Sequence, residues 1–160
     1  MHRRFETADQ IAPAPAATGP AAVPQSMRSQ GVLDIAFRRR GDRTAIERAY
    51  QSGCLRMRLP RGDSALERPC AVLMNTAGGV AEGDRIEQGI AWGEGTVATV
   101  TTQAAEKVYR ALAAGCAIST KLTVARGANA EWLPQETILF DQGALHRTLL
   151  ELEDGLDGQH

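Results

Sequence analysis

Hydrophobic and polar residues alternate with a period of two in several short stretches of the chain. Leu33, Ile35 and Phe37 alternate with polar or small residues, and a similar pattern returns in residues 55–59 and 118–124. Successive side chains of a β-strand point to opposite faces, so this alternation is typical of strands with one buried face. The sequence therefore predicts a strand in each of these three stretches.

Two further stretches favour strands by composition. Residues 71–74 form a short apolar run that suits a strand covered on both faces, and residues 96–101 are rich in β-branched side chains. Glycine-containing turn signals, for example at 41–42, 78–79 and 83–84, separate the predicted strands. Many short strands with turns at close intervals predict a mainly β protein.

The segment 103–114 can be interpreted in two ways. Ala105, Val108, Tyr109 and Leu112 have the spacing of the apolar face of a helix. However, a β-branched stretch leads directly into the segment, and no capping box precedes it. The sequence leaves helix and strand both open here.

The two ends of the chain differ from its centre. Residues 1–30 carry prolines among alanines and few large apolar side chains, which predicts a disordered Pro/Ala-rich tail. Residues 151–160 are acidic and contain glycine, and we expect them to form an acidic flexible tail.

Composition narrows the class of protein. With 160 residues, 43% of them hydrophobic and 23% charged, the chain suits one soluble globular domain. The formal charge of −1 provides no overall field for nucleic acid or an anionic membrane. The run Arg38–Arg40 would point to both faces of a strand, so we interpret it as a solvated edge.

The sequence also indicates where in the cell the protein is located. No stretch approaches the roughly 20 apolar residues of a membrane-spanning helix. Cys54, Cys70 and Cys116 are far apart and form no CxxC pair, which predicts free thiols in a reducing compartment. We therefore expect a cytoplasmic protein with no membrane or nucleic-acid partner.

The sequence predicts no catalytic residues. His146 is the only histidine away from the ends, and no GxSxG motif frames a serine. The glycine-rich residues 75–84 lack the Lys-Ser/Thr of a phosphate-binding loop and include two acids, which predicts a tight turn. A hydrolase that pairs one of the cysteines with His146 is the remaining catalytic alternative.

A tightly bound metal is not expected either, because clustered Cys and His residues are missing. Carboxylates are the remaining candidates for metal ligands, and oxygen ligands hold a divalent ion weakly. Each acid could instead cap a turn or form a salt bridge. Those in or beside the most distinctive segments are Glu82, Asp84, Glu106, Glu136 and Asp141.

Three segments in order carry a family resemblance. They are residues 75–84 (NTAGGVAEGD), 101–110 (TTQAAEKVYR) and 131–141 (EWLPQETILFD). Together they resemble the UreD family of urease accessory proteins, also called UreH, and the resemblance extends over residues 31–150. It implies a mainly β, UreD-like domain of stacked sheets in a helicoidal arrangement, with at most one or two short helices. Family members continue well past the third segment, so the chain resembles the N-terminal part of a family member, and we expect it to be truncated.

The resemblance implies a scaffold for nickel insertion, with no turnover of its own. The family acts with a helical accessory protein and a nickel-carrying GTPase on urease apoprotein, and passes nickel transiently, with no tightly bound cofactor. The alternative is a truncated, non-functional remnant or half of a split gene.

The matching motifs suggest roles for particular residues. The expected nickel-path or partner-contact residues are Asp84, Glu106, Glu136 and Asp141. The expected loop-shaping residues are Gly78, Gly79 and Gly83, and those expected to pack or to form an interface are Tyr109, Trp132 and Pro134.

Overall fold

The computed structural model describes residues 28–60 and 68–154, and every regular element in these two ranges is a β-strand. The strands are β1 (Gln30–Arg40), β2 (Arg43–Gly53), β3 (Leu55–Arg58), β4 (Cys70–Asn75), β5 (Arg85–Trp92), β6 (Val97–Thr102), β7 (Glu106–Val108), β8 (Cys116–Ala125), β9 (Asn129–Leu133), β10 (Thr137–Leu139) and β11 (Leu145–Asp154). The described residues accordingly contain no helix that could cross a bilayer.

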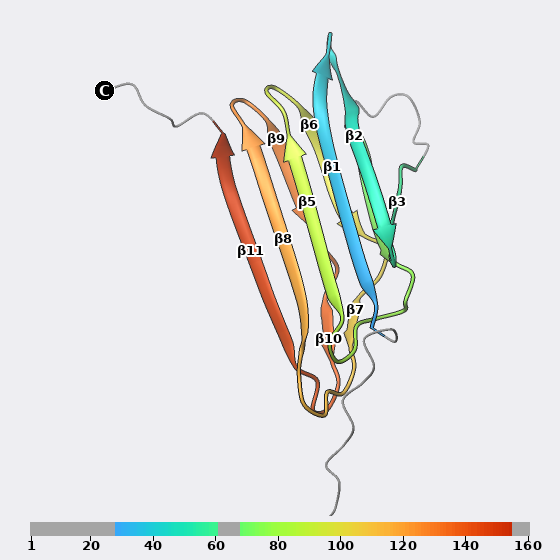
Figure 1. Ribbon diagram of the computed structural model, residues 1–160. Coiled ribbons are helices and arrows are strands. Elements are labelled where there is room, and N and C mark those ends of the chain that lie inside the picture. Colours follow the sequence, from blue (N-terminus) through green and yellow to red (C-terminus); the bar gives the residue numbers. More distant parts are fainter. Residues whose placement is uncertain (1–27, 61–67, 155–160) are drawn as a thin grey trace, which may run out of the picture.

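The strands form three sheets. A five-stranded sheet has the order β11-β8-β5-β1-β2, a four-stranded sheet has the order β3-β4-β6-β9, and a two-stranded sheet pairs β10 with β7. Figure 1 shows the long strands of the five-stranded sheet side by side, with β11 at the left edge and β2 towards the right.

The chain passes through the three sheets in the same order three times. The first coil is β4, Val80 and β5, the second is β6, β7 and β8, and the third is β9, β10 and β11. Arg85 lies beside Ala117 one coil later, and Val80 bridges to Val108 in parallel. One coil thus takes roughly 30 residues, which is within the range of solenoid repeats. The helicoidal arrangement of stacked sheets is confirmed.

The first part of the chain departs from this repeat. β1 pairs in parallel with β5 but antiparallel with β2, and β3 pairs antiparallel with β4. Gly53, at the end of β2, has φ 62°, and a Cβ atom there would lie 1.8 Å from the carbonyl oxygen of Gln30. Only glycine fits at this close approach of two backbones.

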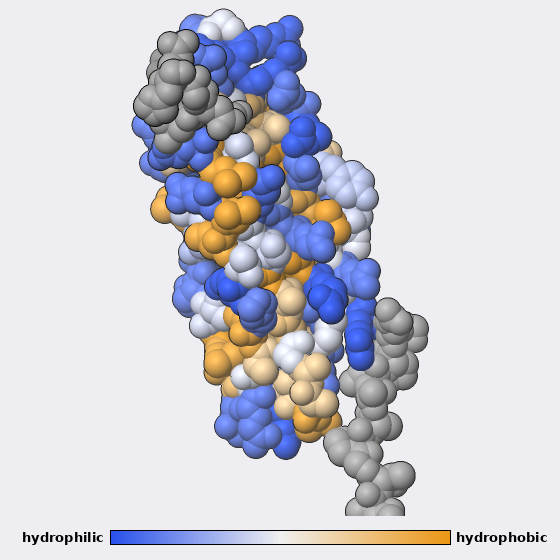
Figure 2. Space-filling view, turned by 60° about the vertical axis from the view of Figure 1, so that its left-hand side comes forward, coloured by the Kyte–Doolittle hydropathy of each residue, from blue (hydrophilic) through white to orange (hydrophobic). Residues whose placement is uncertain are grey.

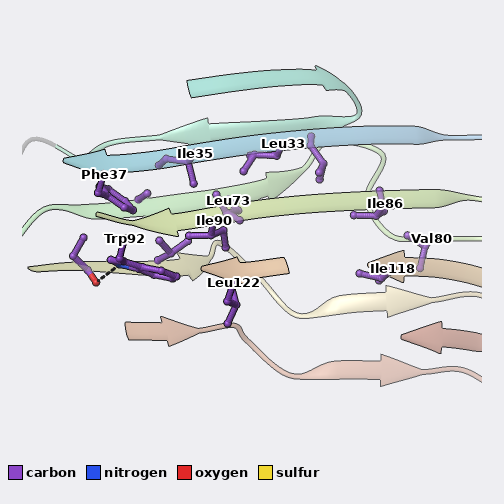
Figure 3. Close-up of a cluster of buried hydrophobic side chains, with 14 of the residues drawn as sticks. Leu33, Ile35, Phe37, Leu73, Val80, Ile86, Ile90, Trp92, Ile118 and Leu122 are labelled. Atoms are coloured by element: carbon purple, nitrogen blue, oxygen red, sulfur yellow. Dashed lines mark hydrogen bonds between the residues drawn. The ribbon is translucent and has the colours of Figure 1, made fainter. Parts of the chain in front are cut away.

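The core lies between the five-stranded and four-stranded sheets (Figure 3). The indole N–H of Trp92 on β5 donates to the carbonyl of Ala98 on β6 at 3.0 Å, and the ring stacks on Phe37 at 6.1 Å. The other buried residues of this cluster are Leu33, Ile35, Leu55, Ala71, Leu73, Val80, Ile86, Ile90, Ala98, Val100, Val108, Cys116, Ile118 and Leu122.

The strands predicted from alternation and composition are confirmed as parts of β1, β3, β4, β6 and β8. The ambiguous segment 103–114 contains strand β7 and bends, with no helix. The reason is pairing: Val108 is fully buried between Val80 of the first coil and Leu139 of the third. Such tertiary contacts override a local helical pattern.

The structure changes the boundaries predicted for the two tails. β1 begins at Gln30, and β11 continues to Asp154 because β8 pairs with it along its whole length. Residues 151–154 therefore belong to a sheet, although the sequence predicts a tail there. The rest of the predicted tails, residues 1–27 and 155–160, lies outside the described residues.

Candidate functional site: a polar cavity between the sheets

Two polar side chains interrupt the apolar interior of the five-stranded sheet. Gln88 lies between Ile86 and Ile90 on the inward face of β5, and Thr120 occupies the neighbouring position on β8. The Thr120 hydroxyl donates to the side-chain oxygen of Gln88 at 2.9 Å. Burying a polar group lowers stability unless the group is hydrogen-bonded. This hydrogen bond satisfies part of the hydrogen-bonding capacity of both side chains.

Two cavities share part of their walls at the level of Gln88. One has a volume of about 390 Å³ and the other about 210 Å³, and both are lined by Gln88, Thr102 and Glu106. The larger cavity extends towards the third coil, where Trp132 and Arg147 also line it. Both cavities have apolar as well as polar walls, and Glu106 is the one carboxylate of the described residues that lines them.

Glu106, the first residue of β7, is half-buried and lines both cavities. Burial raises the pKa of its carboxyl group, while the hydrogen bond from Asn75 and the positive charge of Arg147 lower that pKa to a smaller extent. The Asn75 amide donates to Oε1 of Glu106 at 3.2 Å. Glu106 therefore holds its proton to a higher pH than an exposed glutamate does.

Asn75 connects this carboxylate to the glycine turn. Its amide nitrogen also donates to the Gly79 carbonyl at 3.1 Å, and its oxygen accepts from the Ala77 backbone N–H at 3.0 Å. The turn is therefore built around the same side chain that contacts Glu106.

Gly78 and Gly79 adopt φ values of 79° and 144°, which favour glycine. A Cβ atom on Gly79 would lie 2.7 Å from the Lys107 carbonyl oxygen. The Tyr109 hydroxyl donates to the Gly78 carbonyl at 3.2 Å, and its ring stacks on Phe140 with centroids 5.5 Å apart. Tyr109 thus packs over the turn while remaining partly exposed.

Asp84 lies away from Glu106, in the wall of a separate cavity that Gly79 and Tyr109 also line. It is buried, and its two oxygens accept the backbone N–H groups of Ser29 at 2.6 Å and Ala81 at 2.8 Å. Gly83, with φ 79°, precedes it in the same turn. Both oxygens of Asp84 are thereby engaged in holding the turn against the start of β1.

Glu82, in the same turn, binds three consecutive backbone N–H groups. They belong to Leu112, Ala113 and Ala114, at 2.8–3.1 Å. These hydrogen bonds lower the pKa of the Glu82 carboxyl group. Glu82 therefore fixes the loop between β7 and β8.

The structure brings only some of the predicted site residues together. Glu106, Trp132 and Pro134 line the larger cavity. Glu136 and Asp141 are exposed and line neither cavity. Gln88, Thr120 and Arg147 also line the larger cavity, but sequence reasoning gave them no role. One signal in the sequence could have indicated them: Gln88 and Thr120 are polar residues at equivalent inward positions of two strands that lie one coil apart.

The pairing of Cys116 with His146 has no geometric support. Cys116 faces the core from β8, whereas His146 of β11 lies beside Ala117, on the opposite face. Burial raises the pKa of the Cys54 and Cys116 thiols, so neither is activated as a nucleophile. In the two described ranges no three His, Cys, Asp or Glu side chains gather as a metal site.

Comparison with known proteins identifies the family. The family described as UreD urease accessory protein matches residues 29–155. A urease accessory protein UreD of Chelativorans sp. (strain BNC1) is 46% identical over 129 residues, which are 79% of this chain and 46% of the relative. UreD 1 of Brucella anthropi is 42% identical over 134 residues (82% and 46%), and UreD of Sinorhizobium medicae is 49% identical over 110 residues (68% and 39%). The chain thus spans less than half the length of these curated relatives, and it belongs to the UreD urease accessory protein family.

Proposed function

We propose that this chain is a maturation scaffold for urease and that nickel passes as transient cargo through the two cavities that Glu106 lines. The single observation that supports a route here is that Glu106 lines both cavities. The names of the relatives describe an accessory role towards urease. The scaffold itself has no turnover in this proposal.

The chemistry of the cavity suits passage better than storage. Ni²⁺ binds imidazole and thiolate tightly, whereas carboxylate, carbonyl and water oxygens release it more readily. Glu106 offers a carboxylate, and Gln88 and Thr102 offer neutral oxygens. The positive charge of Arg147, which lowers the pKa of Glu106, also opposes a bound cation and favours its release.

The partners in this proposal follow from the family resemblance. They are the helical urease accessory protein, the nickel-carrying accessory GTPase and urease apoprotein, in the cytoplasm. Glu136 and Asp141 stay predicted nickel-path or partner-contact residues, and their exposure fits contact with a partner better than a path inside the sheets.

Replacing Glu106 tests the route. We expect Glu106→Gln to lower nickel-dependent urease activation about tenfold or more, because the carboxylate ligand is lost while glutamine still accepts the hydrogen bond from Asn75. Activation by the unmodified chain should also fall as the pH drops through the raised pKa of Glu106, since only the ionised group attracts nickel. The measurement is urease activity after addition of nickel to apoprotein with the accessory proteins.

The matched control is Glu87→Gln, the same chemical change on the outer face of β5, beside Gln88. This variant should activate urease as the unmodified chain does. Equal activation by both variants, with unchanged melting temperatures, would show that nickel does not depend on the Glu106 carboxylate.

A further inference from the structure

Charged residues are segregated between the two ends of the helicoid. The stretch 30–58, which contains β1, β2 and β3, carries seven arginines and three acids, whereas the stretch 131–154 carries six acids and one arginine. β2 and β3 are edge strands at one end of their sheets, and β9 and β11 are edge strands at the other end. The formal charge of −1 is therefore the balance of a basic end and an acidic end.

The basic end carries three exposed arginines at the tip of the β1–β2 hairpin, Arg38, Arg40 and Arg43, which we call the arginine tip. Arg38 and Arg40 share the face of β1 opposite to that of the buried Phe37. Arg43 lies directly opposite Arg40 in the register, so its side chain is on the same face. The hairpin projects at the top of Figure 1, and Figure 2 shows the top of the molecule mainly in blue, with orange hydrophobic residues farther down.

The positive charge of the arginine tip is not compensated by the residues around it. Like charges directly opposite each other on neighbouring strands destabilise a sheet, and Arg40 and Arg43 form such a pair. No salt bridge within the described ranges 28–60 and 68–154 includes a residue of the tip or Asp42, the acid in the turn between them. A carboxylate supplied from outside would relieve the repulsion.

Arg39 holds the hairpin in place from the other face. Its guanidinium group donates to the carbonyl of Gly41 and to the carbonyl of Gly95, both at 2.9 Å. Gly95 lies in the turn between β5 and β6, which joins the two large sheets. The backbone that carries the arginine tip is thus fixed before a partner arrives, so little conformational freedom is lost on binding.

We propose that the arginine tip binds an extended acidic segment of another protein, with carboxylates at alternate positions. Alternate residues of an extended segment point to the same side and lie roughly 6–7 Å apart, as Arg38 and Arg40 do along β1. A guanidinium group binds a carboxylate through two parallel N–H···O bonds, which lysine cannot form, and every cation of the tip is an arginine. This inference does not depend on a role in nickel transfer.

Nucleic acid fits the arginine tip less well than an acidic protein segment does. Affinity for a phosphate backbone rises with the number of phosphates that are neutralised, and the tip offers three cations on a chain with a formal charge of −1. Asp42 and Glu94 are exposed in the two turns beside the tip. A protein segment can place a positive side chain opposite these acids, whereas a phosphate backbone has none.

Binding of a synthetic peptide tests the proposal. The probe is a fluorescent peptide in which glutamate alternates with threonine, and the reference peptide has the same composition with its glutamates in one block. In fluorescence anisotropy with the full chain at about 0.15 M salt, we expect the alternating peptide to bind about threefold or more tighter than the block peptide. Arg40→Glu and Arg43→Glu should each weaken its binding about tenfold, because each sets a like charge against the peptide.

The matched control is Arg85→Glu, the same change of charge at an exposed position beside Gln30, at the other end of β1. This variant should bind the alternating peptide as the unmodified chain does. Arg40→Glu should melt at the same temperature as the unmodified chain or higher, since it turns a like-charge pair with Arg43 into a pair of opposite charges. Loss of binding by this variant is then not a loss of folding.

Equal binding of the two peptides, or equal binding of the alternating peptide by the Arg40→Glu, Arg43→Glu and Arg85→Glu variants, would overturn the proposal. Tighter binding of a single-stranded DNA of the same charge, lost in Arg40→Glu, would overturn it in favour of nucleic acid. Self-association of the chain that Arg40→Glu abolishes would overturn it in favour of the acidic end of a second copy.

Discussion

Replacing Trp92 with alanine is expected to lower the free energy of unfolding by about 3–5 kcal/mol, the usual cost of removing a large buried aromatic side chain. Trp92 is 1% exposed, stacks on Phe37 and donates to the Ala98 carbonyl, so it joins the two large sheets. Since domains of this size are stable by only about 5–15 kcal/mol, the loss is a large share of the total. Urea denaturation followed by circular dichroism measures it.

Trp92→Phe separates the two contributions. Phenylalanine keeps most of the apolar contact with Phe37 but leaves the Ala98 carbonyl without its donor. We expect a loss of about 1–3 kcal/mol, clearly smaller than that of alanine. A Trp92→Ala variant within about 0.5 kcal/mol of the unmodified chain would mean that the two sheets do not meet at this residue.

Replacing Asp84 with alanine is expected to cost about 2–4 kcal/mol, because two backbone N–H groups lose a charged acceptor. These N–H groups belong to Ser29, which leads into β1, and to Ala81 in the turn before β5. The change should therefore loosen the contact between β1 and this turn, which hydrogen exchange can locate.

Asp42→Ala is the matched control for Asp84→Ala, because Asp42 lies exposed in the turn between β1 and β2. It should change stability by less than about 0.5 kcal/mol. If Asp84→Ala is as stable as the unmodified chain yet fails to support urease activation, Asp84 acts on the nickel route and not in holding the turn.

Local alternation was sufficient to predict the strands with one clearly apolar face. Leu33, Ile35 and Phe37 on β1 show the pattern plainly. β2 was missed because most of its side chains are exposed, so no apolar face marks it. The extension of β11 through its acidic end was also missed, since Glu151 and Glu153 join the sheet by pairing with β8 and not by burial.

The candidate site was less predictable than the fold. Glu106 was among the residues chosen from the matching motifs, but its burial depends on Asn75 in the preceding coil and on a cavity whose walls come from three sheets. Asp84 was chosen on the same grounds, but its hydrogen bonds to two backbone N–H groups show that it stabilises the turn before β5. A carboxylate's surroundings arise from residues about 30 positions apart in the sequence, which no local pattern contains.

The most direct test of the central claim is nickel-dependent activation of urease apoprotein by the purified chain together with the helical accessory protein and the GTPase. The account predicts that the three accessory proteins co-purify and that urease activity rises with added nickel well above the level reached without this chain. Activity that stays at that level, with the chain soluble but bound to neither partner, would contradict a scaffold role.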